Sequence, residues 1–87
     1  MPQRPDPQIA LGEVICERRE ELEMSQEEVA LAADSSQGRI SEIEGGENPS
    51  YGLAGRIARA LGWSHAELVH RVEQRELKQG SSRGPGT

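Results

Sequence analysis

The stretch SQEEVALAADSSQGRISEIEGG, residues 25–46, holds two short amphipathic helical patterns with a brief polar turn between them. Ser25 and Glu28 have the spacing of a capping box, the reciprocal hydrogen-bonded pair that opens many helices. In the second pattern Ile40 and Ile43 share one face, and Gly45-Gly46 suits a left-handed helix end. This stretch predicts a helix-turn-helix whose second helix keeps one face free for a partner.

Helical spacing continues on both sides of this stretch. It predicts three further helices, at residues 9–22, from Ser50 to Gly62, and from Ser64, where Glu67 completes a second capping box. The sequence contains no strand pattern, so we expect an all-α domain of five helices over residues 9–78. Flexible tails are expected at residues 1–8 and 79–87, because they are rich in proline, glycine or serine and poor in apolar residues.

The composition fits one small domain with an aliphatic core. The chain has 87 residues, one cysteine and no phenylalanine, and its aromatic residues are Tyr51 and Trp63. Cys16 has no partner for an internal disulfide, and its apolar neighbours predict a buried, unreactive thiol in a reducing compartment. No apolar run approaches the roughly 20 residues of a membrane span, and the N-terminal residues lack the apolar segment of a signal peptide. We expect a cytoplasmic protein with no membrane contact.

The net charge of −5 is unevenly distributed along the chain. Residues 9–34 hold eight acidic and two basic side chains, whereas 35–62 hold three of each and 63–78 also hold three of each. Proteins that bind nucleic acid regardless of sequence usually carry basic patches. A nucleic-acid surface on this chain would therefore lie on the neutral later segments and would depend on base contacts and dimerisation.

Short motifs lie in a fixed order across about residues 11–72. They are Leu11-Gly12 with Ile15, Arg19, SQEEVA at 25–30, ISEIEGG at 40–46, Asn48-Pro49-Ser50, Ala60-Leu61-Gly62 and Glu67-Leu68. No single fragment is specific, but the ordered set resembles the Cro and phage-repressor-like helix-turn-helix proteins, the XRE family. The resemblance implies a five-helix, lambda-repressor-like DNA-binding domain, commonly dimeric, whose third helix lies in the major groove while the second crosses the backbone.

The start of the third predicted helix holds the residues expected to face bases. With Ile40 and Ile43 buried, positions 37, 38, 41 and 42 should be exposed. The Gln37 amide can pair with adenine N6 and N7, and Arg39 can reach either a phosphate or guanine O6 and N7. Glu42 carries a carboxylate, which can only accept hydrogen bonds, as from cytosine N4, and which phosphates repel. The expected base contacts are Gln37, Gly38, Arg39, Ser41 and Glu42.

Phosphate contacts position a protein on DNA without reading its sequence. The resemblance gives this role to Gln26, where the side-chain amide and the helix N-terminal amides can reach one phosphate oxygen. The expected phosphate contacts are Ser25, Gln26, Ser35, Ser36, Asn48 and Ser50. The resemblance also implies a structural ion pair across the interior between Arg19 and Glu44.

The remaining polar residues predict no further chemistry. His65 and His70 are five apart, do not share a helical face, and have no cysteine or aspartate cluster beside them, so no metal site is expected. The acidic residues form no pair in a substrate cleft, and we expect no enzyme, cofactor or small-molecule ligand. The sequence leaves two roles open for the apolar residues Val69, Val72 and Leu77: a dimer seam, or part of the monomer core.

The sequence favours a sequence-specific transcriptional regulator, a repressor or small controller. It would bind a palindromic operator in double-stranded DNA as a homodimer, with half-sites about one turn, roughly 34 Å, apart. The alternative is a protein-interaction module of the same fold, an antitoxin-like or anti-repressor partner with weak or no DNA binding. The acidic surface and Glu42 favour that alternative.

Overall fold

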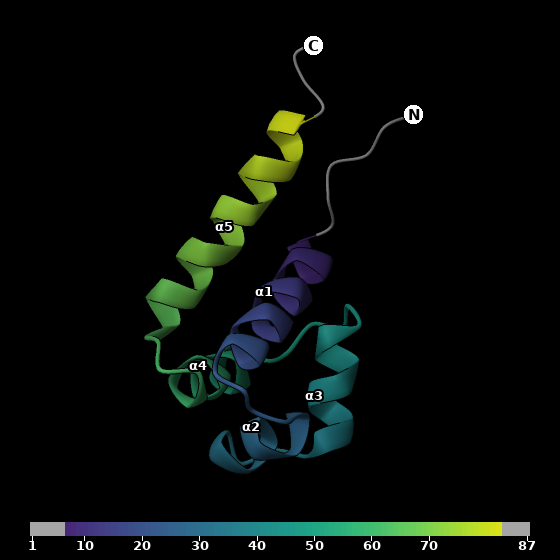
Figure 1. Ribbon diagram of the computed structural model, residues 1–87, viewed down its shortest axis with the longest axis vertical. Coiled ribbons are helices and arrows are strands. Elements are labelled where there is room, and N and C mark those ends of the chain that lie inside the picture. Colours follow the sequence, from purple (N-terminus) through teal and green to yellow (C-terminus); the bar gives the residue numbers. More distant parts are fainter. Residues whose placement is uncertain (1–6, 83–87) are drawn as a thin grey trace.

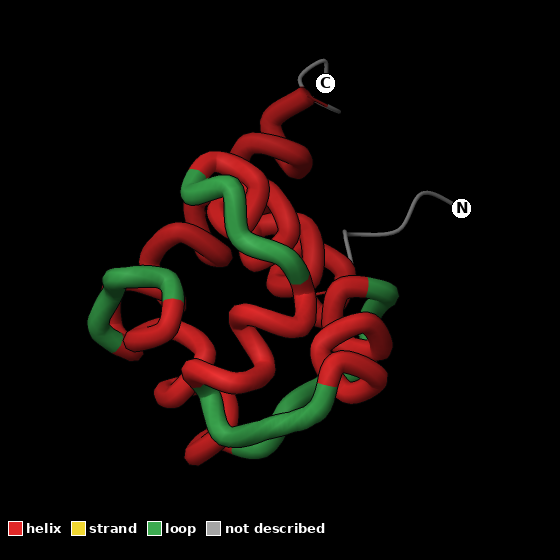
Figure 2. Tube along the Cα trace, turned by 60° about the horizontal axis from the view of Figure 1, so that its bottom comes forward, coloured by secondary structure: helices red, strands yellow, loops and turns green. Residues whose placement is uncertain are grey.

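The computed structural model describes residues 7–82, and five α-helices joined by short loops make up most of them (Figures 1 and 2). The helices are α1 (Pro7–Glu21), α2 (Gln26–Ala32), α3 (Gln37–Glu44), α4 (Tyr51–Ala60) and α5 (His65–Ser82). The described residues contain no strand, and the predicted all-α, five-helix class is confirmed. The tails expected at 1–8 and 79–87 overlap the ends of α1 and α5, and residues 1–6 and 83–87 lie outside the described part.

Serine side chains cap the N-terminal ends of four helices, α2, α3, α4 and α5. The Ser25 hydroxyl accepts a hydrogen bond from the Glu28 backbone N–H at 3.0 Å, and the Glu28 carboxylate accepts from the Ser25 N–H at 2.8 Å. This confirms the capping box predicted for α2. Ser36 and Ser50 cap α3 and α4 through their hydroxyl oxygens. Each cap satisfies a helix N–H that has no partner in its own helix, which stabilises the helix by about 1 kcal/mol.

The second predicted capping box, at the start of α5, forms only in part. The Ser64 hydroxyl accepts from the Glu67 N–H at 3.0 Å. The Glu67 carboxylate, however, accepts from the Arg71 Nε at 2.6 Å, one helical turn further on. This hydrogen bond lowers the pKa of Glu67. The Glu67 carboxylate therefore binds Arg71, four residues further on, instead of the Ser64 N–H that the predicted capping box requires.

Two turns place non-glycine residues in the left-handed region of backbone conformation. Glu23 and Asp34 both have φ of 57°. Aspartate is among the residues that tolerate this conformation best, whereas glutamate bears a strain of roughly 1–2 kcal/mol. The left-handed helix end predicted at Gly45-Gly46 is confirmed at Gly46 (φ 118°), and Gly62 after α4 also has positive φ (81°).

All five helices contribute side chains to one aliphatic core. α1 lies between α3 and α5, α2 packs on α3 and α4, and α4 also packs on α5 (Figure 1). The largest fully buried side chains are Ile15, Val29, Ile40, Ile43, Ile57, Leu61 and Leu68. Burying a side chain of this size contributes about 1.5–3 kcal/mol, so the core rather than helix propensity fixes the position of the short helices α2 and α3.

Two side chains at the margin of the core, Cys16 and Trp63, are only partly buried and contact polar or charged groups. Cys16 is partly exposed rather than buried, because its thiol faces polar groups: it donates to the Glu20 carboxylate at 3.7 Å and accepts from Arg19 at 3.6 Å. Burial and the nearby carboxylates raise its pKa. Trp63 packs against the core, and the Arg18 and Arg71 guanidinium groups each lie 4.9 Å from its ring centroid.

Candidate nucleic-acid interface

α3 has one apolar side in the core and one polar side in solvent. Ile40 and Ile43 have no exposed surface, whereas Gln37, Gly38, Ser41 and Glu42 are exposed. The predicted division of this helix into buried and exposed positions is confirmed. These four exposed residues are called the outer face of α3 below. Figure 1 shows α3 at the edge of the domain.

Arg39 lies on the flank of α3 rather than on the outer face. Its guanidinium donates to the Glu42 carboxylate at 3.2 Å and to the Asn48 carbonyl at 3.2 Å. The first contact is an ion pair between residues three apart on the same helix. The second joins α3 to the loop that follows it. Arg39 therefore connects the outer face to this loop.

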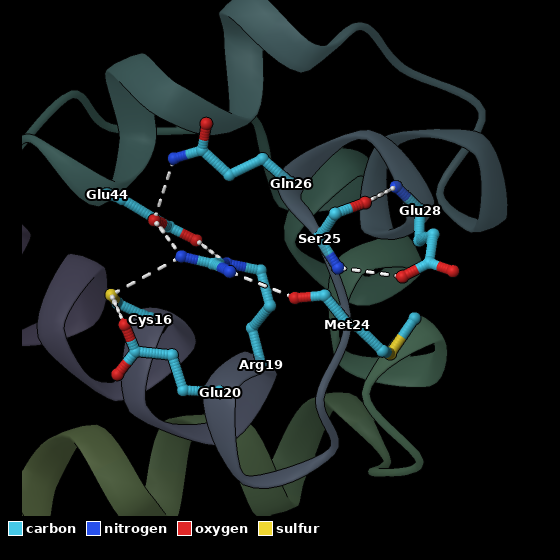
Figure 3. A network of polar contacts seen from close by, with 8 residues as sticks. All are labelled: Cys16, Arg19, Glu20, Met24, Ser25, Gln26, Glu28 and Glu44. Carbon is cyan, nitrogen blue, oxygen red and sulfur yellow. Dashed lines mark hydrogen bonds and ion pairs between the residues drawn. The ribbon is translucent and has the colours of Figure 1, made fainter.

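The Arg19–Glu44 pair ties α3 to α1. Arg19 Nε donates to Glu44 at 2.7 Å and its Nη2 donates at 3.2 Å, while Nη1 donates to the Met24 carbonyl at 2.9 Å (Figure 3). The side chains are only 14% and 8% exposed. Burial alone would raise the pKa of Glu44, but hydrogen bonds from Arg19 and Gln26 outweigh it and lower the pKa. The pair stays ionised and holds α3 at a fixed position on the domain.

Gln26, at the first position of α2, also binds Glu44. Its Nε2 donates to the Glu44 carboxylate at 3.0 Å (Figure 3). The sequence did not predict this contact, since the two residues lie on different helices. An amide nitrogen carries two N–H donors, so one remains for a further acceptor such as a phosphate oxygen. Glu44 thus fixes the orientation of the Gln26 amide as well as the position of α3.

A family model described as "Helix-turn-helix" matches residues 17–68, which include α2, α3 and the turn between them. The chain belongs to the Cro and phage-repressor-like helix-turn-helix family. Proteins of this XRE family are DNA-binding transcription regulators, and this protein is one of them.

Solved structures agree with this family. Two crystal structures of the clp gene regulator ClgR from Corynebacterium glutamicum are similar to this chain. One has 27% sequence identity and a TM-score of 0.83, and the match covers 92% of this chain and 86% of that chain. The other has 29% identity and a TM-score of 0.73, with 82% and 94% covered. No curated protein sequence matches the chain.

Within this helix-turn-helix domain, the serines expected at phosphates occupy helix starts. The hydroxyl oxygens of Ser25, Ser36 and Ser50 accept backbone N–H groups, which leaves each O–H free to donate. Ser35 is partly buried in the turn, and its N–H donates to the Ala30 carbonyl at 2.8 Å. Asn48 is exposed in the loop after α3. These residues lie around α2 and α3 but do not form one cluster of contacting side chains.

Arg56 is a structural contact of the helix-turn-helix that sequence reasoning missed. It extends from α4 and donates through Nε to the Ala33 carbonyl at 2.8 Å. Ala33 is the C-cap of α2, so Arg56 satisfies a carbonyl group at the end of that helix and anchors the turn before α3. The sequence gives no signal for this contact, because the two residues are 23 positions apart.

The residues of the expected dimer seam differ in exposure. Val72 packs against the core, whereas Val69 is 42% and Leu77 is 71% exposed. Tyr51, 81% exposed, lies near Val69 in an open groove, and its ring meets that of His65 edge-on at 4.3 Å.

Neither a metal site nor a membrane span is found in the described part of the chain. Among the described residues no group of three or more histidine, cysteine or acidic side chains can hold a metal ion. No helix in this part of the chain has the length and apolarity to cross a membrane.

Gly38 provides a test of how closely the outer face approaches DNA. A methyl group added at Gly38 meets nothing within 4 Å. Gly38→Ala should therefore raise the free energy of unfolding by about 0.5–1 kcal/mol, because alanine favours the helix. We expect the same change to weaken DNA binding by roughly fivefold, about 1 kcal/mol, because the methyl group would occupy space on the face expected to contact bases. Denaturant unfolding and fluorescence anisotropy measure the two effects. Unchanged affinity would show that DNA does not approach Gly38.

Proposed function

We propose that this protein is a transcriptional repressor that binds a palindromic operator as a homodimer, with α3 of each subunit in the major groove. The observation that carries the proposal is the outer face of α3, a row of exposed small and polar side chains on a helix whose other side is fixed in the core. A rigid helix of this kind suits the groove, which is wide enough to admit an α-helix. Half-sites are expected about one turn, roughly 34 Å, apart.

The contacts divide into two kinds. Gln37, at the N-terminal end of the outer face, reads a base through its amide, and Gly38 and Ser41 allow the helix to lie close to the base edges. Gln26 and the helix-start serines contact phosphates, the former with its amide oriented by Glu44. Because the chain carries a net charge of −5, non-specific affinity is low, and two subunits on one operator supply the strength of binding.

The dimer uses the exposed apolar residues of α5. Val69 and Leu77 lie on this helix beside Val72, which is anchored in the core. A two-fold interface pairs the same patch on both subunits, as a palindromic operator requires. In this proposal the protein acts in the cytoplasm by binding DNA alone, without catalysis or a cofactor.

Selection from random duplexes at low salt tests this function. Enrichment of a palindromic site, bound by two subunits, supports the proposal. The second candidate is a protein-interaction module of the same fold, which is favoured by one observation: the Glu42 carboxylate is 61% exposed on the outer face, where phosphates would repel it. No enrichment at micromolar protein favours that candidate and contradicts the operator-binding function.

The different roles of Gln37 and Gln26 give a prediction. Gln37→Ala should relax the preference at one base pair by about 1–3 kcal/mol, because a base-reading amide is lost. Gln26→Ala should weaken binding to all sequences alike, because a phosphate contact carries no sequence information. Affinities for the selected operator and for single-base variants, measured at one salt concentration, separate the two. Equal losses on every duplex for both variants would contradict the assigned roles.

A further inference from the structure

Glu42 lies beside the centre of the outer face of α3. Successive residues turn by about 100° around a helix, so Gly38 lies almost opposite the buried side formed by Ile40 and Ile43, with Ser41 and Glu42 about 50° to either side of that centre. Gln37 and Ser41 lie toward one edge of the outer face, and Arg39 lies on the other flank. Gly38 has no side chain and open space beside it. Glu42 is therefore the long side chain that extends furthest toward anything that α3 contacts.

The chemistry of a carboxylate restricts what it can meet in a major groove. An ionised carboxylate has acceptors only. Guanine presents two acceptors there, thymine an acceptor and a methyl group, and adenine a donor flanked by an acceptor. Cytosine alone presents its N4 amino donor without a neighbouring acceptor on the same base. The base that fits an exposed glutamate on this face is cytosine.

Arg39 makes a carboxylate at this place compatible with DNA. Its guanidinium lies 3.2 Å from Glu42, and its contact with the Asn48 carbonyl holds it against the domain. The two side chains together have no net charge, so the outer face meets the phosphates without an isolated anion. We propose that Glu42 is a specificity-determining residue that accepts a hydrogen bond from cytosine N4, and that Arg39 positions it. This inference rests on the proposed function, since it requires α3 to lie in the groove.

The test compares selections from random duplexes for the wild-type protein, Glu42→Gln and Gln37→Ala. The wild-type site should contain a C·G pair in each half-site at which Glu42→Gln alone changes the preference. Glutamine pairs with adenine N6 and N7, so that position should change from C·G to A·T. On duplexes that differ only there, the ratio of affinities should change by roughly tenfold. Gln37→Ala should change a different position, and an unaltered unfolding curve shows that each variant is folded.

A double-mutant cycle tests the role of Arg39. Arg39→Ala should weaken binding to every duplex, because it leaves the Glu42 carboxylate unpaired among phosphates. Adding Glu42→Gln to Arg39→Ala should restore most of that general loss. If the loss is not restored, Arg39 contacts DNA directly and the positioning role is wrong.

The outcomes of the selection separate the two levels of the proposal. A palindromic wild-type site whose sequence is unchanged by Glu42→Gln overturns the cytosine contact and leaves the operator-binding function standing. A wild-type protein that selects no site overturns the operator-binding function itself, and the cytosine contact with it.

Discussion

Replacing Glu44 by glutamine should lower the free energy of unfolding by about 3–5 kcal/mol. The substitution keeps the shape of the side chain but leaves the Arg19 guanidinium, 14% exposed, without its counter-charge. A small domain of 87 residues has a total stability of roughly 4–13 kcal/mol, so this loss is a large fraction of it. Urea unfolding followed by circular dichroism gives the difference. Glu67→Gln, which breaks an exposed pair with Arg71, is the matched control and should cost less than about 1 kcal/mol.

The cause of this loss is the unpaired charge, and a second variant tests that cause. Arg19→Met leaves the Glu44 carboxylate buried and should be as damaging as Glu44→Gln. Arg19→Met combined with Glu44→Leu removes both charges and places apolar atoms of similar volume between α1 and α3. The double variant should therefore be more stable than either single variant. If the two single losses simply add, the explanation by an unpaired buried charge is wrong.

The pH dependence of the same pair follows from the pKa of Glu44. This pKa is lower in the folded protein than its ordinary value of 4.5, because the hydrogen bonds from Arg19 and Gln26 outweigh burial. A lowered folded-state pKa stabilises the protein above the ordinary pKa, and the contribution is lost as the pH falls through the folded value. The stability difference between wild type and Glu44→Gln should therefore be full at pH 7 and shrink below about pH 4.5. A difference that stays constant down to acidic pH would exclude a charged Glu44 as its source.

The helix-turn-helix was predictable because its signals are local. A serine and a glutamate three residues apart begin α2, and the spacing of Ile40 and Ile43 decides which side of α3 enters the core. Both features depend on neighbours within one or two helical turns, which the sequence displays directly. For the same reason the exposed positions of α3 followed from its buried ones.

Two of the contacts between helices that hold the candidate site in place could not be predicted from the sequence. Arg56 reaches the Ala33 carbonyl across 23 positions, and Gln26 reaches Glu44 across 18. Neither contact has a local pattern, because each depends on how two separate helices cross. Cys16 was expected to be buried among apolar neighbours, but it is partly exposed beside Arg19 and Glu20 of its own helix. Arg39 was expected to face DNA, and its engagement with the loop at Asn48 depends on the path of the chain after α3.

Gly12→Ala should be the most damaging change of a single small residue in this domain. A methyl group at Gly12 in α1 would lie 2.6 Å from the carbonyl oxygens of both Ile43 and Glu44, at the end of α3. These are backbone atoms and cannot rotate away, so α1 and α3 must separate. Overpacking of this kind costs about 1–3 kcal/mol, and the gain in helix propensity from alanine offsets roughly 1 kcal/mol of it. Because the clash is with two backbone oxygens, we expect a net loss in the free energy of unfolding toward the upper end of this balance, about 1–2 kcal/mol.

Gly38→Ala is the matched control, because Gly38 lies in a helix of the same domain but has no neighbour within 4 Å of an added methyl group. The two substitutions should have opposite effects on stability. The close approach at Gly12 also brings α1 near the Glu44 backbone, so separation of the helices should weaken the Arg19–Glu44 pair. Gly12→Ala and Glu44→Gln together should then cost less than the sum of their separate losses. A stability of Gly12→Ala equal to or above that of the wild type would mean that α1 and α3 do not approach as closely as this packing requires.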